Sequence, residues 1–203
     1  MGFVAPDLVV ESRLRATLKL IRQDPTILDD AMERFSASGR KEIRDFLLQR
    51  DIPVLQGWPV QNAQVPCIAV ALRPAMEQTQ RQSLTPFDSY ATEEGNLTTI
   101  AAFTGSTVQC LCYGHSQREA TIVGMVTWWM LWVLRMEFQQ QRMVEQSITV
   151  SDYEQVPSND EGGGLWFLRA VNLTCTTIDT LSLVEGPVIA AVTLALQGTG
   201  DVV

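Results

Sequence analysis

The sequence has few of the residues from which metal and catalytic sites are usually built. His115 is its one histidine, and its four cysteines form no C-x-x-C pair. A structural zinc site takes four thiolate or imidazole ligands, usually at short spacings. We therefore expect no metal, no cofactor and no catalytic residues, and we interpret the four cysteines as small core residues of strands.

A stretch long enough to cross a membrane is also missing. The strongly apolar run 120–134 stops at Arg135 and is shorter than the about 20 residues that a spanning helix needs. The first residues show no basic segment followed by an apolar one, the pattern of a signal peptide. We therefore expect no membrane partner and synthesis in a reducing cytoplasm.

Basic residues are outnumbered. Fifteen lysines and arginines face 23 aspartates and glutamates, which gives a formal net charge of −8. A dedicated nucleic-acid binder would carry a basic face instead. The charge remains compatible with a surface past which DNA slides without being held.

The most informative stretch is residues 116–142, which the pattern predicts to be one long central helix. Ser116 and Glu119 form a Ser-x-x-Glu capping box, in which each side chain is expected to accept a hydrogen bond from the other residue's backbone N–H. The helix is apolar nearly all round, so more than one of its sides should be buried. Trp128, Trp129 and Trp132 are therefore candidates for core packing or a subunit or partner interface rather than for a ligand platform.

The rest of the chain predicts an α+β fold with a mixed or antiparallel sheet on that helix. We expect one domain over 1–203, with N-terminal helices in 7–50, an α+β core over 52–180 and a C-terminal strand at 187–197. Strands are expected at 52–57, 66–72, 107–113, 148–153 and 165–178. A change of apolar parity near 169–171 predicts a bulge in the last of these.

Residues 74–105 are polar and rich in threonine and glutamine, with few large apolar side chains. Two extended segments about a turn near residues 93–96 would make a projecting β-hairpin arm. Such an arm suits docking on another strand edge, and Phe87 and Tyr90 are its candidate contact residues.

Two other classes of function stay open at this stage. A cytoplasmic α+β enzyme could use Cys112 and His115, which lie close together where a strand enters the long helix; a helix N-terminus lowers a thiol's pKa. A binding module for a small molecule or peptide could use the tryptophans.

The order of elements resembles the tail-terminator proteins of tailed bacteriophages. The resemblance covers roughly residues 40–180. It consists of the strand TVQCLCYG entering the helix SQREATIVGMVTWWMLWVL, followed by the strand SITVSDYEQ, a glycine-rich loop and the strand LWFLRAVNLTCTTI.

This resemblance implies a structural virion protein of the tail and neck. It implies a homo-oligomeric ring, most often of six subunits, that caps the tail tube and joins it to the neck, with double-stranded DNA passing through the lumen. The partners would be other copies, the tail tube protein, neck or connector proteins and, in a contractile tail, the sheath. The helices in residues 7–35 and the strand after Pro187 depart from the pattern, so another neck or head–tail connector protein is the alternative.

Overall fold

The computed structural model describes residues 4–29, 32–33, 35–57, 64–73, 90–91, 97–157 and 164–184; of 90–91, 97–103 and 179–184 it describes the backbone alone. The chain forms two compact units. The larger consists of Val4–Glu77 and Gly105–Thr177, and the smaller of Met1–Phe3, Gln78–Thr104 and Ile178–Val203. The single domain over 1–203 stays a prediction.

The helices of the larger unit begin and end where local chemistry favours it. They are α1 (Pro6–Gln23), the 3₁₀ helix η1 (Pro25–Leu28), α2 (Ala37–Gln49), α3 (Gln117–Val133) and α4 (Arg135–Gln140). Val10, Leu14, Leu18 and Ile21 form the buried stripe of α1, and their spacing of three or four residues is that of one helix face. Asp24 caps η1 and Ser36 caps α2, each by accepting a backbone N–H.

The capping box that opens α3 differs from the prediction in one bond. Ser116 Oγ accepts from the backbone N–H of Glu119 at 3.2 Å, as expected. The Glu119 carboxylate, however, accepts from the N–H of His115 at 2.9 Å, one residue earlier than predicted. Both bonds hold the turn between the preceding strand and α3.

The prediction of one long helix over 116–142 is wrong in one respect. The helix is divided at Leu134 into α3 and α4. Arg135 and Gln146 hold the break through reciprocal bonds. Arg135 Nη2 donates to the Gln146 carbonyl at 3.0 Å, and Gln146 Nε2 donates to the Arg135 carbonyl at 2.9 Å. Leu134, at the break, and Phe138, beyond it, are both buried in the core.

A mixed sheet confirms the α+β class. Its strands are β1 (Val54–Gln56), β2 (Cys67–Leu72), β4 (Leu97–Gly114), β5 (Met143–Pro157) and β6 (Leu165–Val184), in the order β1-β2-β4-β6-β5. β1 is parallel to β2, whereas β2 with β4 and β5 with β6 are antiparallel. The Tyr113–Trp166 ring contact and the Thr107–Thr174 hydroxyl pair show that β4 and β6 are antiparallel too.

A bulge lies where the sequence predicts one, but in the partner strand. Val150 pairs with Val171 and Tyr153 with Arg169, so the extra residue belongs to β5 and not to β6. Ser151 occupies the bulge, where its hydroxyl accepts from the N–H of Ala170 at 3.0 Å. The side chain therefore replaces a missing bond of the ladder.

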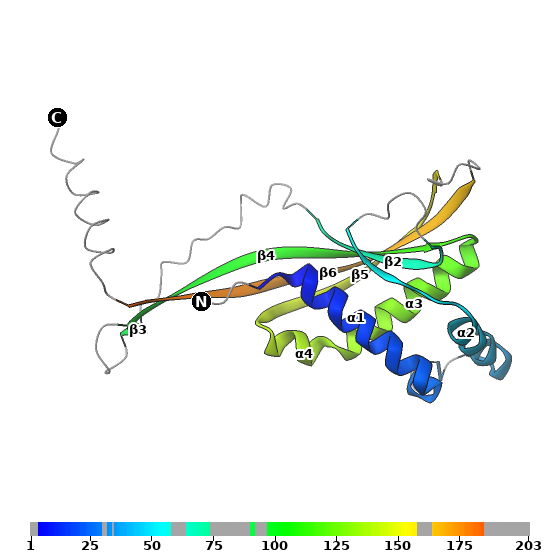
Figure 1. Ribbon diagram of the computed structural model, residues 1–203, viewed down its shortest axis with the longest axis horizontal. Helices are drawn as coiled ribbons and strands as arrows, with labels where there is room; N and C mark the ends of the chain where they lie inside the picture. The colour runs from blue at the N-terminus through cyan, green and yellow to red at the C-terminus, as the bar shows by residue number, and fades with distance from the viewer. Residues whose placement is uncertain are drawn as a thin grey trace. The chain divides into compact units, whose positions relative to one another are not determined.

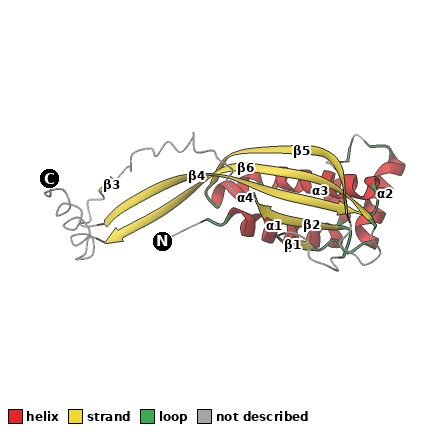
Figure 2. Ribbon diagram, turned by 90° about the horizontal axis from the view of Figure 1, so that it is seen from above, coloured by secondary structure: helices red, strands yellow, loops and turns green. Residues whose placement is uncertain are grey.

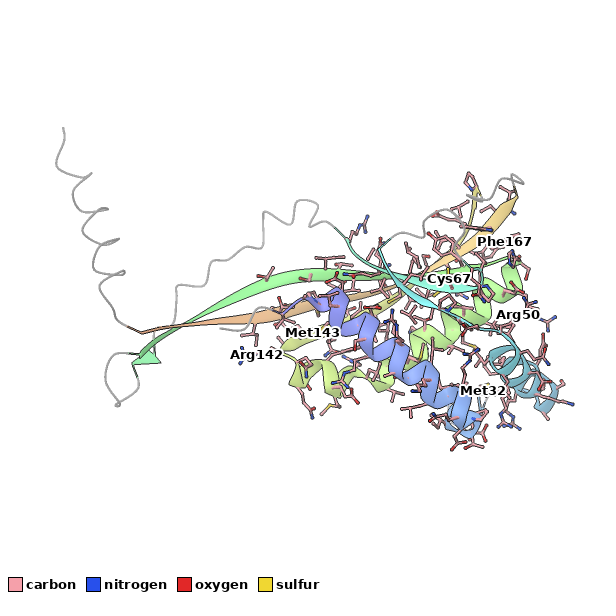
Figure 3. All side chains as sticks on the ribbon, viewed as in Figure 1. Met32, Arg50, Cys67, Arg142, Met143 and Phe167 are labelled. Atoms are coloured by element: carbon pink, nitrogen blue, oxygen red, sulfur yellow. The ribbon has the colours of Figure 1, made fainter. Side chains whose placement is uncertain are left out.

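Both faces of the sheet carry apolar clusters. In the larger unit the helices lie on one face (Figures 1 and 2). Val108, Cys110 and Cys112 of β4 belong to the cluster beneath the helices, whereas Leu111 and Tyr113 belong to a smaller cluster with Trp166. Because successive side chains of a strand alternate between faces, the second cluster lies on the face away from the helices. Figure 3 labels Cys67, a member of this second cluster, on β2.

In the smaller unit, β3 (Tyr90–Ala91) pairs antiparallel with the first part of β4, Tyr90 opposite Thr99 and Ala91 opposite Thr98. Most of the expected β-hairpin arm, including Phe87, and the expected strand at 187–197 lie outside the described residues. The projecting arm therefore stays a prediction. Within the part of the chain that is described, no helix has the length and apolar character needed to cross a membrane.

We expect Gly114→Ala to destabilise the fold. A Cβ at this position would lie 2.6 Å from the backbone nitrogen of Ala120 and 2.7 Å from Glu119 Cβ, so α3 would have to move. Overpacking of this kind costs about 1–3 kcal/mol. Urea unfolding measures the loss, with Gly39→Ala as the control because its nearest neighbour would be Ser36 Oγ at 3.4 Å. Equal stability of Gly114→Ala and the wild-type chain would contradict this packing.

Candidate interaction surface

Trp128 and Trp132 form the centre of an exposed apolar surface on the helical layer. They lie one turn apart on α3, with exposed fractions of 38% and 48%, and Met136 of α4 follows at 68%. We call these three residues the tryptophan surface. Aromatic residues and methionine are enriched in the cores of protein interfaces, so a contiguous group of them in solvent indicates a contact site.

The tryptophan surface is ordered in advance of any contact. The rings of Trp128 and Trp132 meet edge to face, with centroids 6.1 Å apart and planes at 61°. The guanidinium of Arg135 lies 4.7 Å from the Trp132 ring centroid, and the same group is held by the carbonyl of Gln146. Cation–π contact and ring packing reduce the side-chain entropy that binding would otherwise remove.

The three predicted tryptophans do not lie on one surface. Trp129 is only partly exposed and packs against the core cluster that contains Met130 and Phe138. A helix turns by about 100° per residue, so neighbours in sequence cannot share one face. The structure thus keeps Trp128 and Trp132 as surface candidates and places Trp129 at the edge of the core. Of the other two candidates, Phe87 lies outside the described residues, and of Tyr90 only the backbone in β3 is described.

Cys112 and His115 bind different partners. The Cys112 thiol is buried and donates to Thr127 Oγ1 at 3.4 Å, inside the helical core. His115 is exposed, and its Nε2 lies 3.0 Å from the carbonyl oxygen of Val65, to which the Nε2–H tautomer donates. Burial raises the pKa of the Cys112 thiol from 9.0 to about 12, although the bond to Thr127 lowers it somewhat. A thiol in this state stays protonated at neutral pH, which does not favour a nucleophile.

The described residues contain no group of three histidine, cysteine, aspartate or glutamate side chains that could hold a metal ion. Asp29, one of the acidic side chains near the start of the chain, instead pairs with Arg44. This pair joins the end of η1 to α2.

A groove beside β1 was not predicted. It has a volume of about 410 Å³ and lies between α1, the end of α2 and the segment that leads into β1. Leu18, Leu47 and Pro53 line it, and Arg15, Lys19 and Arg22 stand along α1 beside them. We call it the basic groove. The i, i+4, i+7 spacing of these three cations in the sequence could have indicated a basic stripe on the helix.

A scan against models of protein families finds no match for this chain, and a search of curated proteins finds no significantly similar sequence.

We expect the stability of the fold to fall as the pH rises above about 9. Burial raises the pKa of Cys67 and Cys175 to about 11 and that of Cys112 to about 12, against an ordinary value of 9.0. The folded state therefore keeps these protons where the unfolded state loses them. The stability that they contribute is full below pH 9 and is lost as the pH rises toward 11–12.

Urea unfolding at a series of pH values between 8 and 10.5 measures this decline. Cys112→Ala should decline less steeply than the wild-type chain, whatever its stability at pH 8. Ile43→Val, which alters the core without removing a thiol, should keep the wild-type slope. A Cys112→Ala slope equal to that of the wild-type chain would contradict the assignment.

Proposed function

We propose that this chain is a tail terminator of a tailed bacteriophage, a structural protein of the virion that is not an enzyme. Its copies form a ring, with six subunits as the resemblance implies, which caps the finished tail tube and joins it to the neck. In a contractile tail the ring also meets the last layer of sheath. Genomic DNA passes through the lumen without specific binding.

The tryptophan surface is the observation that carries this proposal. In a monomer, two indoles that pack on each other beside an arginine would leave their apolar area in water, and such exposed patches mark interaction sites. Tryptophan and arginine are the residue types that contribute most to binding when an interface buries them. Assembly of copies into a ring would cover this surface with a neighbouring copy.

The order of elements and the charge support the same proposal. The strand β4 leads through a capped turn into α3, and β5 and β6 follow, which is the order from which the resemblance was drawn. With a formal charge of −8, the protein surface along a lumen would repel the phosphate groups of DNA, so DNA could leave the virion without being held. A neighbouring position in the neck is the nearest variant of this proposal. The enzyme interpretation has less support, since the Cys112 thiol is buried and protonated.

The functional test uses tail tube protein from the same phage genome. Added to polymerising tube protein, the wild-type chain should bind tube ends and shorten the length distribution seen by negative-stain electron microscopy. The double variant Trp128→Ser, Trp132→Ser should weaken self-association about 30-fold or more, the loss expected when interface centres are removed, and should cap tubes poorly.

The matched control is Leu48→Ser, because Leu48 of α2 has the same exposed fraction, 48%, as Trp132. It should assemble and cap like the wild-type chain. Sedimentation velocity measures association, and circular dichroism checks that all variants are folded. Wild-type protein that leaves tube length unchanged would contradict the terminator role. Variants that associate as tightly as wild type would contradict the role of the tryptophan surface.

A further inference from the structure

A closed ring needs two different surfaces on every copy, which meet head to tail. We propose that these are the two open edges of the sheet: the β5 edge of one copy docks into the basic groove beside β1 of the next. The inference rests on the proposed function and specifies how its subunits recognise one another. β1 and β5 end the strand order, so they lie at opposite edges of the same sheet (Figure 2).

Three cations and one carboxylate, Asp51, line the groove at the β1 edge, and one of the cations forms no ion pair among the described residues. Arg22 binds Asp51 and the carbonyl of Arg50, and Arg15 pairs with Glu11. Lys19 is exposed between them, and within the described residues no carboxylate pairs with it. The groove therefore combines an apolar lining with a positive charge that has no ion-pair partner among the described residues.

The β5 edge has the opposite charge. Asp152 and Glu154 are exposed and take no part in the ion pairs of the described residues. Val150 and Tyr153 beside them have exposed fractions of 38% and 49%. This edge thus offers carboxylates next to apolar side chains, which is the complement of cations next to an apolar groove.

The contact is made by side chains and not by an added strand ladder. The bonds from Ile68 N–H to the Pro53 carbonyl and from Gly57 N–H to the Val70 carbonyl fix which backbone groups of β1 face β2. The backbone groups of Val54 alternate with these and point to the open edge, where Arg15 Nη2 already donates to the Val54 carbonyl at 3.0 Å. At the opposite edge of the sheet, the register shifts make β5 irregular, which disfavours a continuous ladder with an added strand.

The tryptophan surface belongs to the same half of the larger unit as β5. α3 and α4 pack against β5, whereas α1 packs against β1 and β2. The apolar surface and the acidic edge would then approach the next copy together, and the basic groove would receive them. The opposite charges at the two edges also give the contact a direction, which a symmetric dimer would lack.

A charge swap tests this contact in the full-length chain. Lys19→Glu alone and Glu154→Lys alone should each weaken self-association by about three- to tenfold at low salt, because each places like charges across the contact. The double variant Lys19→Glu, Glu154→Lys restores opposite charges and should recover most of the lost association. Sedimentation velocity over a range of protein and salt concentrations measures the dissociation constants.

Lys41→Glu and Glu33→Lys are the controls, since both residues are exposed and lie outside the groove and β5. They should leave association unchanged. Wild-type rings that the single swaps do not weaken would overturn this contact and leave the proposed function standing. Single swaps that weaken association with no recovery in the double variant would also overturn it. A wild-type chain that never associates, even with tube protein, would overturn both proposals.

Discussion

Close packing of α3 against β4 and β6 holds the larger unit together. At Gly124 the helix has no side chain, and Arg169 Cδ would lie only 3.0 Å from an added Cβ, so the helix backbone approaches β6 closely. Three residues further on, Thr127 is fully buried and receives the Cys112 thiol of β4. α1 packs beside α3 and against β1 and β2, and the buried residues of these elements belong to one apolar cluster.

That packing also decides which part of an apolar helix stays in solvent. The sheet covers one side of α3 and α1 covers part of another, which buries residues such as Ala120, Val123 and Met130. The remaining side carries Trp128 and Trp132. An exposed apolar side on an otherwise buried helix loses its contact with water only when another molecule covers it, and this supports the proposal that the chain assembles.

Local patterns predicted the features that depend on neighbouring residues in the chain. The stripe of α1, the Ser116 cap and the strand at 66–72, observed as β2, are of this kind, and so is the α+β class. The break at Leu134 is not visible in the helical pattern, because the bonds that hold it come from Gln146 of β5, outside the helix. The bulge was assigned to the wrong strand because Ser151 supplies its hydrogen bond from β5. Which tryptophan faces the core could not be predicted, since that depends on where the sheet and α1 lie.

The distribution of charge gives the two halves of the larger unit different characters. Cations gather along α1 beside β1, and carboxylates lie along β5 at the other edge, in a chain whose total charge is −8. Surfaces of opposite sign at opposite edges favour head-to-tail contacts and disfavour the meeting of like edges. Closed rings follow when such contacts repeat about an axis.

The solution mass of the wild-type chain, measured over a range of concentrations together with negative-stain images of the same sample, tests the central claim most directly. The account predicts rings with an open centre, formed either by the chain alone at high concentration or when tail tube protein is added. A strict monomer or dimer that ignores tube protein would contradict it.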